Sequence, residues 1–253
     1  MKHIRLGFGC LVAAAFCVAA AAPALADDAA AGAPTSPWSA IWAGGAFKNH
    51  VSAAFAGGVF AANGTLDSDG LLFRGEYTYV GYDFTSALSS SGSAHGTLNR
   101  ANAEVGYQLV RYGINSSLFV GPDYQDFNTT PSAAGNGKLS DKLGAMFVGR
   151  VARTDSPQIP ASLEGNYSTA NSTYWSKAKV GINFGQITVG PEIALLGNAA
   201  FDEARYGGYS AFTVVPGIIL QGSLGYSQRL RSSSQISSSE GAYVDVSIIL
   251  LNY

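Results

Sequence analysis

Hydrophobic and polar residues alternate along most of the chain after residue 38. In WSKAKVGINF (residues 175–184), Lys177 and Lys179 fall on one side of an extended chain, while Ala178 and Val180 fall on the other. A period of two is typical of β-strands, because successive side chains point to opposite faces of a sheet. The sequence therefore predicts a β-sheet protein with one apolar and one polar face.

The same alternation divides the chain into twelve strand-like segments. Each is close to the ~9–11 residues with which a tilted strand crosses a bilayer. An even number of strands would bring both chain ends to the same side of a membrane. The segments cover residues 39–47, 51–61, 71–83, 96–109, 114–125, 141–153, 159–169, 173–184, 187–197, 204–214, 217–229 and 242–253.

The connections between these segments differ in length. FTSALSSSGSAH, NTTPSAAGNGKLS and RSSSQISSSEG follow the third, fifth and eleventh segments, whereas VRYG, GQ and PG follow the fourth, eighth and tenth. Long loops at one end and short turns at the other are typical of transmembrane barrels. NGTLDSDG is an exception, because it is long but lies at the short-turn end. The pattern predicts an all-β fold, a closed antiparallel up-and-down transmembrane β-barrel of about twelve strands.

Composition narrows the choice of architecture. Charged residues make up 13% of the chain, well below the ~25% of a typical soluble domain. No run of 18 apolar residues follows residue 26, so transmembrane helices are excluded. A soluble periplasmic β-scaffold would show the same alternation and stays open as an alternative. Twelve successive strands without a covering helix favour the closed barrel, which has no exposed edge.

The N-terminal residues have the features of a secretory signal peptide. Lys2 and Arg5 precede an apolar run, and residues 24–26 (Ala-Leu-Ala) offer a small-residue cleavage site. We therefore expect an exported protein that resides in the outer membrane. The expected organisation is a signal peptide over 1–26, a short linker over 27–38 and a single barrel domain over 39–253.

Cleavage would also change the chemistry of the chain. It removes both cysteines, Cys10 and Cys17, so the mature protein has no thiol chemistry. Loss of Lys2 and Arg5 leaves 15 − 2 = 13 basic against 17 acidic residues, a net charge of 13 − 17 = −4, with no basic cluster. These features argue against nucleic acid as a partner. Outer-membrane lipid is the expected surrounding.

The polar face carries charges of both signs, and in a lipid-embedded barrel this face turns toward the lumen. We expect ion pairs there, in a lumen between that of a small filled barrel and that of a wide porin. A two-residue turn at Gly185-Gln186 predicts that Lys179 lies directly opposite Glu192. The candidate lumen-lining residues are Arg74, Glu76, Glu104, Asp123, Arg150, Glu164, Lys177, Lys179 and Glu192.

Catalysis has little support in the sequence. Only two histidines, His50 and His95, follow residue 26, and both lie in connections. An outer-membrane lipid or glycan hydrolase would need one of them beside a serine and an orienting acid. No metal-ligand spacing, phosphate loop or nucleophile elbow is present. We therefore predict no catalytic residue, no cofactor and no metal site.

A short motif occurs twice inside strand-like segments. FVGPDY and TVGPEI each place Gly-Pro before a carboxylate, which is Asp123 in the first and Glu192 in the second. Proline cannot donate a hydrogen bond to a neighbouring strand, so each motif predicts a bulge or a break in pairing.

Aromatic residues gather near the predicted strand ends. Interfacial girdles at the two membrane surfaces explain them better than sugar-stacking platforms do. The residues expected in the girdles are Trp38, Trp42, Tyr124, Trp175, Phe184 and Tyr253.

Three segments carry a family resemblance: GPDYQD (121–126), YSTANSTYWSKAKVGINF (167–184) and ITVGPEIALLGNAAFDEARYGGYSAF (187–212). In the last, GPEIALLGN is followed by Asp202 and Arg205. With these segments the chain resembles the cellulose biosynthesis protein BcsS family of alphaproteobacteria. The resemblance implies an exported outer-membrane protein that is encoded with bacterial cellulose synthase components, and it implies no catalytic residues.

The combined expectation is a non-catalytic outer-membrane β-barrel that assists bacterial cellulose biosynthesis or secretion as a conduit, gate or scaffold. Its expected partners are outer-membrane lipid, cellulose and cellulose-secretion components. Three alternatives stay open at this stage: a general small-solute porin, an outer-membrane lipid or glycan hydrolase, and a soluble periplasmic β-scaffold.

Overall fold

The alternating segments form strands in the computed structural model, which describes residues 36–62, 64–85, 92–130, 139–232 and 240–253. The expected signal peptide, residues 27–35 of the expected linker and parts of the three long connections lie outside the described residues. Residues Ser36–Tyr253 belong to one structural unit.

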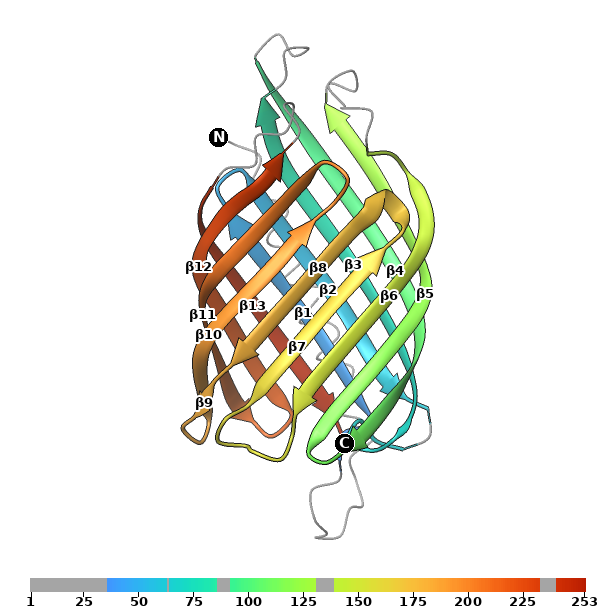
Figure 1. The fold of residues 1–253 in the computed structure, drawn as a ribbon, viewed down its shortest axis with the longest axis vertical. Helices are drawn as coiled ribbons and strands as arrows, with labels where there is room; N and C mark the ends of the chain where they lie inside the picture. Colours follow the sequence, from blue (N-terminus) through green and yellow to red (C-terminus); the bar gives the residue numbers. More distant parts are fainter. Residues whose placement is uncertain (1–35, 63, 86–91, 131–138, 233–239) are drawn as a thin grey trace. The chain divides into compact units, whose positions relative to one another are not determined.

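The described residues of this unit form thirteen strands and one short 3-10 helix, and the strands stand side by side in one wall (Figure 1). Nearly every segment that alternates in the sequence is extended. The elements are β1 (Ser39–Lys48), β2 (Val51–Ala61), β3 (Gly70–Thr85), β4 (Ser93–Arg111), β5 (Ile114–Thr130), β6 (Lys142–Arg153), β7 (Ala161–Ser168), η3 (Ala170–Ser172), β8 (Thr173–Val180), β9 (Ile182–Asn183), β10 (Ile187–Gly197), β11 (Phe201–Val215), β12 (Ile218–Ser232) and β13 (Gly241–Asn252).

The strands pair antiparallel in chain order and close on themselves. β1 pairs with β2 on one side and with β13 on the other, where Ser39 lies opposite Asn252. β9 continues β8, because both pair with β10 in a single register. The wall therefore consists of twelve strands, and the predicted closed antiparallel barrel is confirmed.

Turn residues explain the tight hairpins at one end of the barrel. Tyr112 and Gly113 both have positive φ, 51° and 74°, as a type I′ turn requires. Gly185 has φ 85° in the first position of its two-residue turn, and Gly217 has φ 87° after a proline. We call this end the short-turn end and the opposite one the long-loop end.

Strands β3, β4 and β5 are longer than the sequence predicts, with 16, 19 and 17 residues. Their extra length projects at the long-loop end (Figure 1). The predicted bounds 71–83, 96–109 and 114–125 were too short, because the extensions keep their pairing but not the apolar alternation. Asp83 pairs with His95 there, and Thr97 with Asn128.

The two faces of the wall have opposite chemistry. Leu118 and Phe184 are 74% and 68% exposed on the outer face, whereas Glu104 on the inner face is 4% exposed. A small apolar cluster also lies on the inner face, formed by Leu72, Phe119, Met146 and Val148. Among the described residues, no helix is long and apolar enough to cross a membrane.

Candidate functional site

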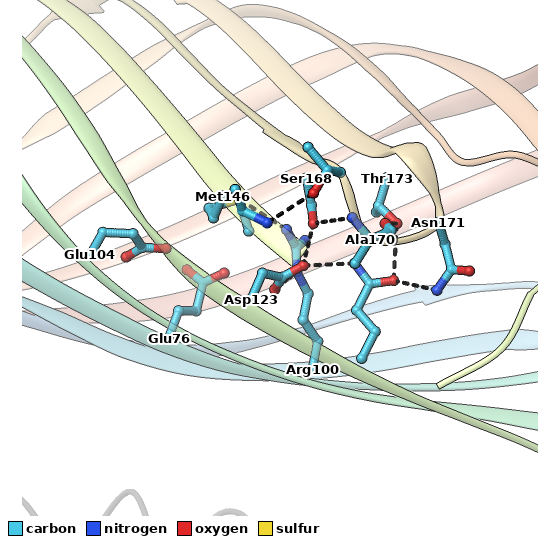
Figure 2. Close-up of polar contacts among 12 residues, drawn as sticks. Glu76, Arg100, Glu104, Asp123, Met146, Ser168, Ala170, Asn171 and Thr173 are labelled. Carbon is cyan, nitrogen blue, oxygen red and sulfur yellow. Dashed lines mark hydrogen bonds and ion pairs between the residues drawn. The ribbon is translucent and has the colours of Figure 1, made fainter. Parts of the chain in front are cut away.

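Asp123 on β5 is the centre of a buried polar cluster on the inner face (Figure 2). Its carboxylate is 0% exposed. It accepts hydrogen bonds from Arg100 Nε at 2.8 Å, Gln125 Nε2 at 2.8 Å and Ser168 Oγ at 2.5 Å. A buried charge is stable only when it is paired and hydrogen-bonded, and Asp123 meets both conditions.

The short helix η3 and the residue that follows it supply further side chains of this cluster. η3 connects β7 to β8 and holds Asn171 with φ 53°. Asn171 Nδ2 and Thr173 Oγ1 donate to Gln125 Oε1 at 3.1 and 3.2 Å. Gln125 in turn donates to Asp123. The cluster therefore joins four strands, β4, β5, β7 and β8, through side chains.

The Gly-Pro motif of β5 breaks the pairing without forming a bulge. Asn102 pairs with Asp123 and Val105 with Val120, so the register is the same on both sides of the gap. A Cβ atom on Gly121 would lie 1.9 Å from the carbonyl oxygen of Ala103. Only glycine allows this close approach, and the proline that follows needs no hydrogen-bond acceptor.

The motif of β10 repeats this construction. Glu192 pairs with Lys179 and Val189 with Ile182, again in one register. The predicted pairing of Lys179 with Glu192 is thus confirmed. A Cβ atom on Gly190 would lie 1.9 Å from the carbonyl oxygen of Val180.

Both motifs also place the ion pair in the same way. Asp123 binds Arg100, which lies two residues before its direct partner Asn102. Glu192 lies 3.5 Å from Lys177, which is two residues before its direct partner Lys179. Glu192 further accepts hydrogen bonds from Ser223 at 2.9 Å and Tyr243 at 3.1 Å.

A chain of ion pairs runs from β1 to β10 along the inner face. Its pairs are Lys48–Glu203 (2.5 Å), Glu203–Arg205 (2.8 Å), Arg205–Asp245 (3.7 Å), Asp245–Lys177 (3.3 Å) and Lys177–Glu192 (3.5 Å). β8 and β13, which carry Lys177 and Asp245, are not neighbours in the wall. These side chains therefore span part of the lumen rather than lie along one hairpin.

A third group surrounds Arg74 on β3. Its guanidinium pairs with Glu76 at 2.8 Å and with Glu104 at 3.2 Å. The indole of Trp42 donates to Glu76 at 3.2 Å and lies under the guanidinium of Arg74, 5.4 Å from ring centre to Cζ.

Trp42 therefore faces the lumen, and its predicted place in an interfacial girdle was wrong. The same holds for Trp175, whose ring lies 5.8 Å from Lys177 Nζ. Both residues lie near strand ends in the sequence, but their position in the alternation puts them on the polar face. Tyr209 and Tyr243 add two more aromatic rings to the inner face, each beside a cation, Lys179 or Arg205.

The remaining candidates lie on the same face. Arg150 pairs in register with Glu164 across β6 and β7. Lys179 contacts Gln221 Oε1 at 3.3 Å and the ring of Tyr209, not the carboxylate that it faces. The structure thus brings eight of the nine candidates into three groups and one separate pair, and Lys179 lies apart from them beside Gln221 and Tyr209.

Several charged residues of these groups are absent from the candidates chosen from the sequence. They are Lys48, Arg100, Glu203, Arg205 and Asp245. Arg100 could have been found, because it alternates in step with Glu104. Glu203 could not, because a register shift between Asp202 and Glu203 interrupts the alternation of β11.

The residues weighed for hydrolysis lie elsewhere. His50 occupies a tight turn with φ 63°. His95 Nδ1 lies 2.8 Å from Asp83 Oδ1, and both side chains are more than half exposed at the long-loop end. In the described ranges, no group of three His, Cys, Asp or Glu residues has an arrangement that could hold a metal ion.

A closed twelve-stranded wall that is apolar outside and charged inside defines an outer-membrane-type β-barrel. A comparison with protein families agrees with the resemblance found in the sequence. The family model described as "Cellulose biosynthesis protein BcsS" matches residues 40–251, so the chain belongs to the BcsS family. No curated protein sequence matches significantly.

Similarity to solved structures extends over most of this chain at low sequence identity. A mutant of TodX, a monoaromatic hydrocarbon channel, is 8% identical with a TM-score of 0.53, over 87% of this chain and 91% of that one. The KdgM porin in complex with disordered oligogalacturonate is 8% identical, over 83% and 98% of the two chains, with a TM-score of 0.43. Outer membrane phospholipase A from Escherichia coli is 10% identical, over 89% and 95%, also at 0.43.

Proposed function

We propose that this protein is a non-catalytic outer-membrane β-barrel that assists the secretion of bacterial cellulose as a conduit. Family membership supports the link to cellulose biosynthesis. The apolar outer face of the wall supports a location in the membrane, because exposed Leu and Phe side chains suit lipid rather than water. On this proposal the mature protein lies in the outer membrane, with its short-turn end toward the periplasm.

The observation that carries the conduit role is the combination of ion pairs and aromatic rings on one inner face. A glucan chain offers hydroxyl groups for hydrogen bonds and C–H faces for contact with aromatic rings. Trp42 and Trp175 turn toward the lumen beside carboxylates and cations. These side chains are mutually paired, so a neutral hydrated polymer would meet no large excess charge of either sign.

Deletion of the gene is the direct test. We expect extracellular cellulose to fall while synthase activity in washed inner membranes stays normal, because nothing in the chain resembles a glycosyl-transfer site. Normal surface cellulose in the deletion strain under inducing conditions would reject the proposal. So would a parallel loss of synthase activity. A role as a general small-solute porin would instead give normal cellulose together with reduced solute uptake.

A point variant tests the inner face itself. Lys179→Gln removes a cation that contacts Gln221 and Tyr209 and has no carboxylate within 4.0 Å among the described side chains. We expect altered cellulose export with normal barrel assembly. Lys177→Glu is less informative, because it would place a third carboxylate beside Glu192 and Asp245 and impair folding. Val180→Thr, on the outer face of the same strand, is the matched control.

Membrane location needs its own measurement. The folded protein should keep a compact mobility in unheated SDS and shift on boiling, since a closed barrel leaves no edge from which unfolding can start. It should also stay with the membrane during carbonate extraction. Release by carbonate without heat-modifiable mobility would support a soluble periplasmic β-scaffold.

A further inference from the structure

The connection between β2 and β3 lies at the short-turn end and is longer than a tight turn. Its residues 64–69 fold against the inner face of the wall. Leu66 packs against the apolar cluster formed by Leu72, Phe119, Met146 and Val148, together with Val59 and Ala61. This connection therefore packs against an apolar cluster built from β3, β5 and β6 near the short-turn end of the lumen.

The backbone of the connection is held from several directions. Leu66 N donates to the carbonyl oxygen of Pro37, just before β1, at 2.7 Å. The Leu66 carbonyl accepts hydrogen bonds from Gln108 Nε2 at 2.8 Å and Asn115 Nδ2 at 3.2 Å. Gln108 Nε2 also donates to the Ser68 carbonyl at 2.9 Å. A buried glutamine, 4% exposed, thus holds two successive parts of the connection.

Asp69 fixes the far end of the segment. Its carboxylate accepts a hydrogen bond from the backbone N–H of Val110 at 2.8 Å and pairs with Arg111. The Val110 hydrogen bond and the Arg111 contact hold the pKa of Asp69 below its ordinary value of 3.8. Arg111 immediately precedes the β4–β5 turn, so this contact lies at the rim of the barrel.

From these contacts we infer that residues 64–69 form a latch that narrows the short-turn mouth of the lumen and must move before a solute wider than water can pass. One apolar side chain inserts into the lumen, and a set of exchangeable polar contacts holds it there. An apolar constriction resists the passage of ions, because water leaves it readily. At the rim the Arg111 side chain is 61% exposed, so its contact with Asp69 can open without disturbing the paired strands. The inference does not depend on cellulose being the transported polymer.

The absence of cysteine after residue 17 allows a direct test in the full mature protein. In the variant Asp69→Cys/Arg111→Cys, a short bifunctional thiol reagent bridges the two positions whose side chains now form the ion pair. Potassium chloride currents are recorded in planar bilayers before and after bridging. We expect the unbridged form to conduct at least about twofold more than the bridged form. Heat-modifiable mobility verifies that both forms are folded.

Arg153→Cys/Asp155→Cys is the matched control. These residues also form an ion pair at the short-turn end, but it lies beside the β6–β7 connection and not in the latch. Bridging this pair should leave the current unchanged. A second variant, Leu66→Ser, should raise the current without any reagent, whereas Asp67→Asn on the same connection should not.

Two results would overturn the latch. One is an equal current in the bridged and unbridged forms of the Asp69/Arg111 variant, whether that current is large or zero. The other is an unchanged current in Leu66→Ser with normal heat-modifiable mobility. Loss of current on bridging the control pair would also count against the latch. In that case a restraint anywhere at the short-turn end would block the current, and residues 64–69 would have no special role.

Discussion

Replacing Asp123 by asparagine removes one charge from the inner face and changes little of its shape. The substitution leaves the guanidinium of Arg100 buried without its carboxylate. The new amide NH2 group would also face one of the hydrogen-bond donors that now bind the carboxylate, which belong to Arg100, Gln125 and Ser168. Breaking a buried ion pair by removing one partner costs ~3–5 kcal/mol. We use the lower limit, about 3 kcal/mol, because hydroxyl and amide groups nearby can reorient.

Reversible urea unfolding in lipid vesicles, followed by tryptophan fluorescence, measures this loss. For a domain of this length, a loss of about 3 kcal/mol corresponds to a fall of about 6–12 °C in the temperature at which heat-modifiable mobility is lost. The double variant Arg100→Gln/Asp123→Asn should lose less than the sum of the two single variants, because no orphaned charge remains.

Asp155→Asn is the control for this experiment. Arg153 and Asp155 form an ion pair of similar length whose side chains are about half exposed. Its loss should cause no measurable change, since solvent screens such pairs. The reasoning fails if Asp123→Asn and Asp155→Asn have equal effects. It also fails if the effects of Arg100→Gln and Asp123→Asn simply add, because the two residues would then act independently.

Three further predictions concern Glu192, Gly121 and Asp69. Glu192→Gln should destabilise the barrel as Asp123→Asn does, measured in the same unfolding assay, because both carboxylates occupy the same construction. Gly121→Ala should lower the free energy of unfolding by ~1–3 kcal/mol, because the added Cβ atom would lie 1.9 Å from a backbone carbonyl oxygen. Gly75→Ala should be nearly neutral, since the atom nearest to its added Cβ is 3.5 Å away. The contribution of Asp69 to the latch should be fully present above pH 3.8, the ordinary pKa, and lost as the pH falls through its lowered folded pKa. The potassium chloride current should therefore be constant from about pH 8 to 5 and rise only below about pH 3.8. Asp69→Asn should abolish that rise. A rise already at about pH 5, or one that persists in Asp69→Asn, would contradict the role of Asp69 in the latch.

Much of the wall could be predicted because its chemistry repeats every second residue. In β8, Lys177 and Lys179 alternate with Ala178 and Val180, so local sequence alone determines the faces. The turn at Gly185 then determines the register with β10, and Lys179 lies opposite Glu192 as predicted. Strand ends were less predictable, because pairing continues in β4 after the outward residues become polar.

The grouping of the charged residues could not be predicted for a different physical reason. Alternation assigns a residue to a face but not to a partner across the lumen. Lys177 and Asp245 meet at 3.3 Å although 68 residues and three strands separate them. Their contact depends on the tilt and closure of the barrel, which no local pattern encodes. Trp42 lies near a strand end, but its place in the alternation is what turns it toward the lumen, beside Glu76 and Arg74.

The two Gly-Pro-carboxylate motifs connect the structure of the wall with the chemistry of the lumen. At each gap the chain gives up hydrogen bonds between neighbouring strands, at Gly121-Pro122 in β5 and at Gly190-Pro191 in β10. The carboxylate that follows each gap binds side chains beyond the adjacent strand: Asp123 accepts from Ser168 on β7, and Glu192 from Tyr243 on β13. Lumenal bonds therefore stabilise the wall where its own pairing lapses. A substitution that frees either carboxylate should weaken the barrel and disorder its inner face together, so stability and lumen shape are expected to change in step at these two positions.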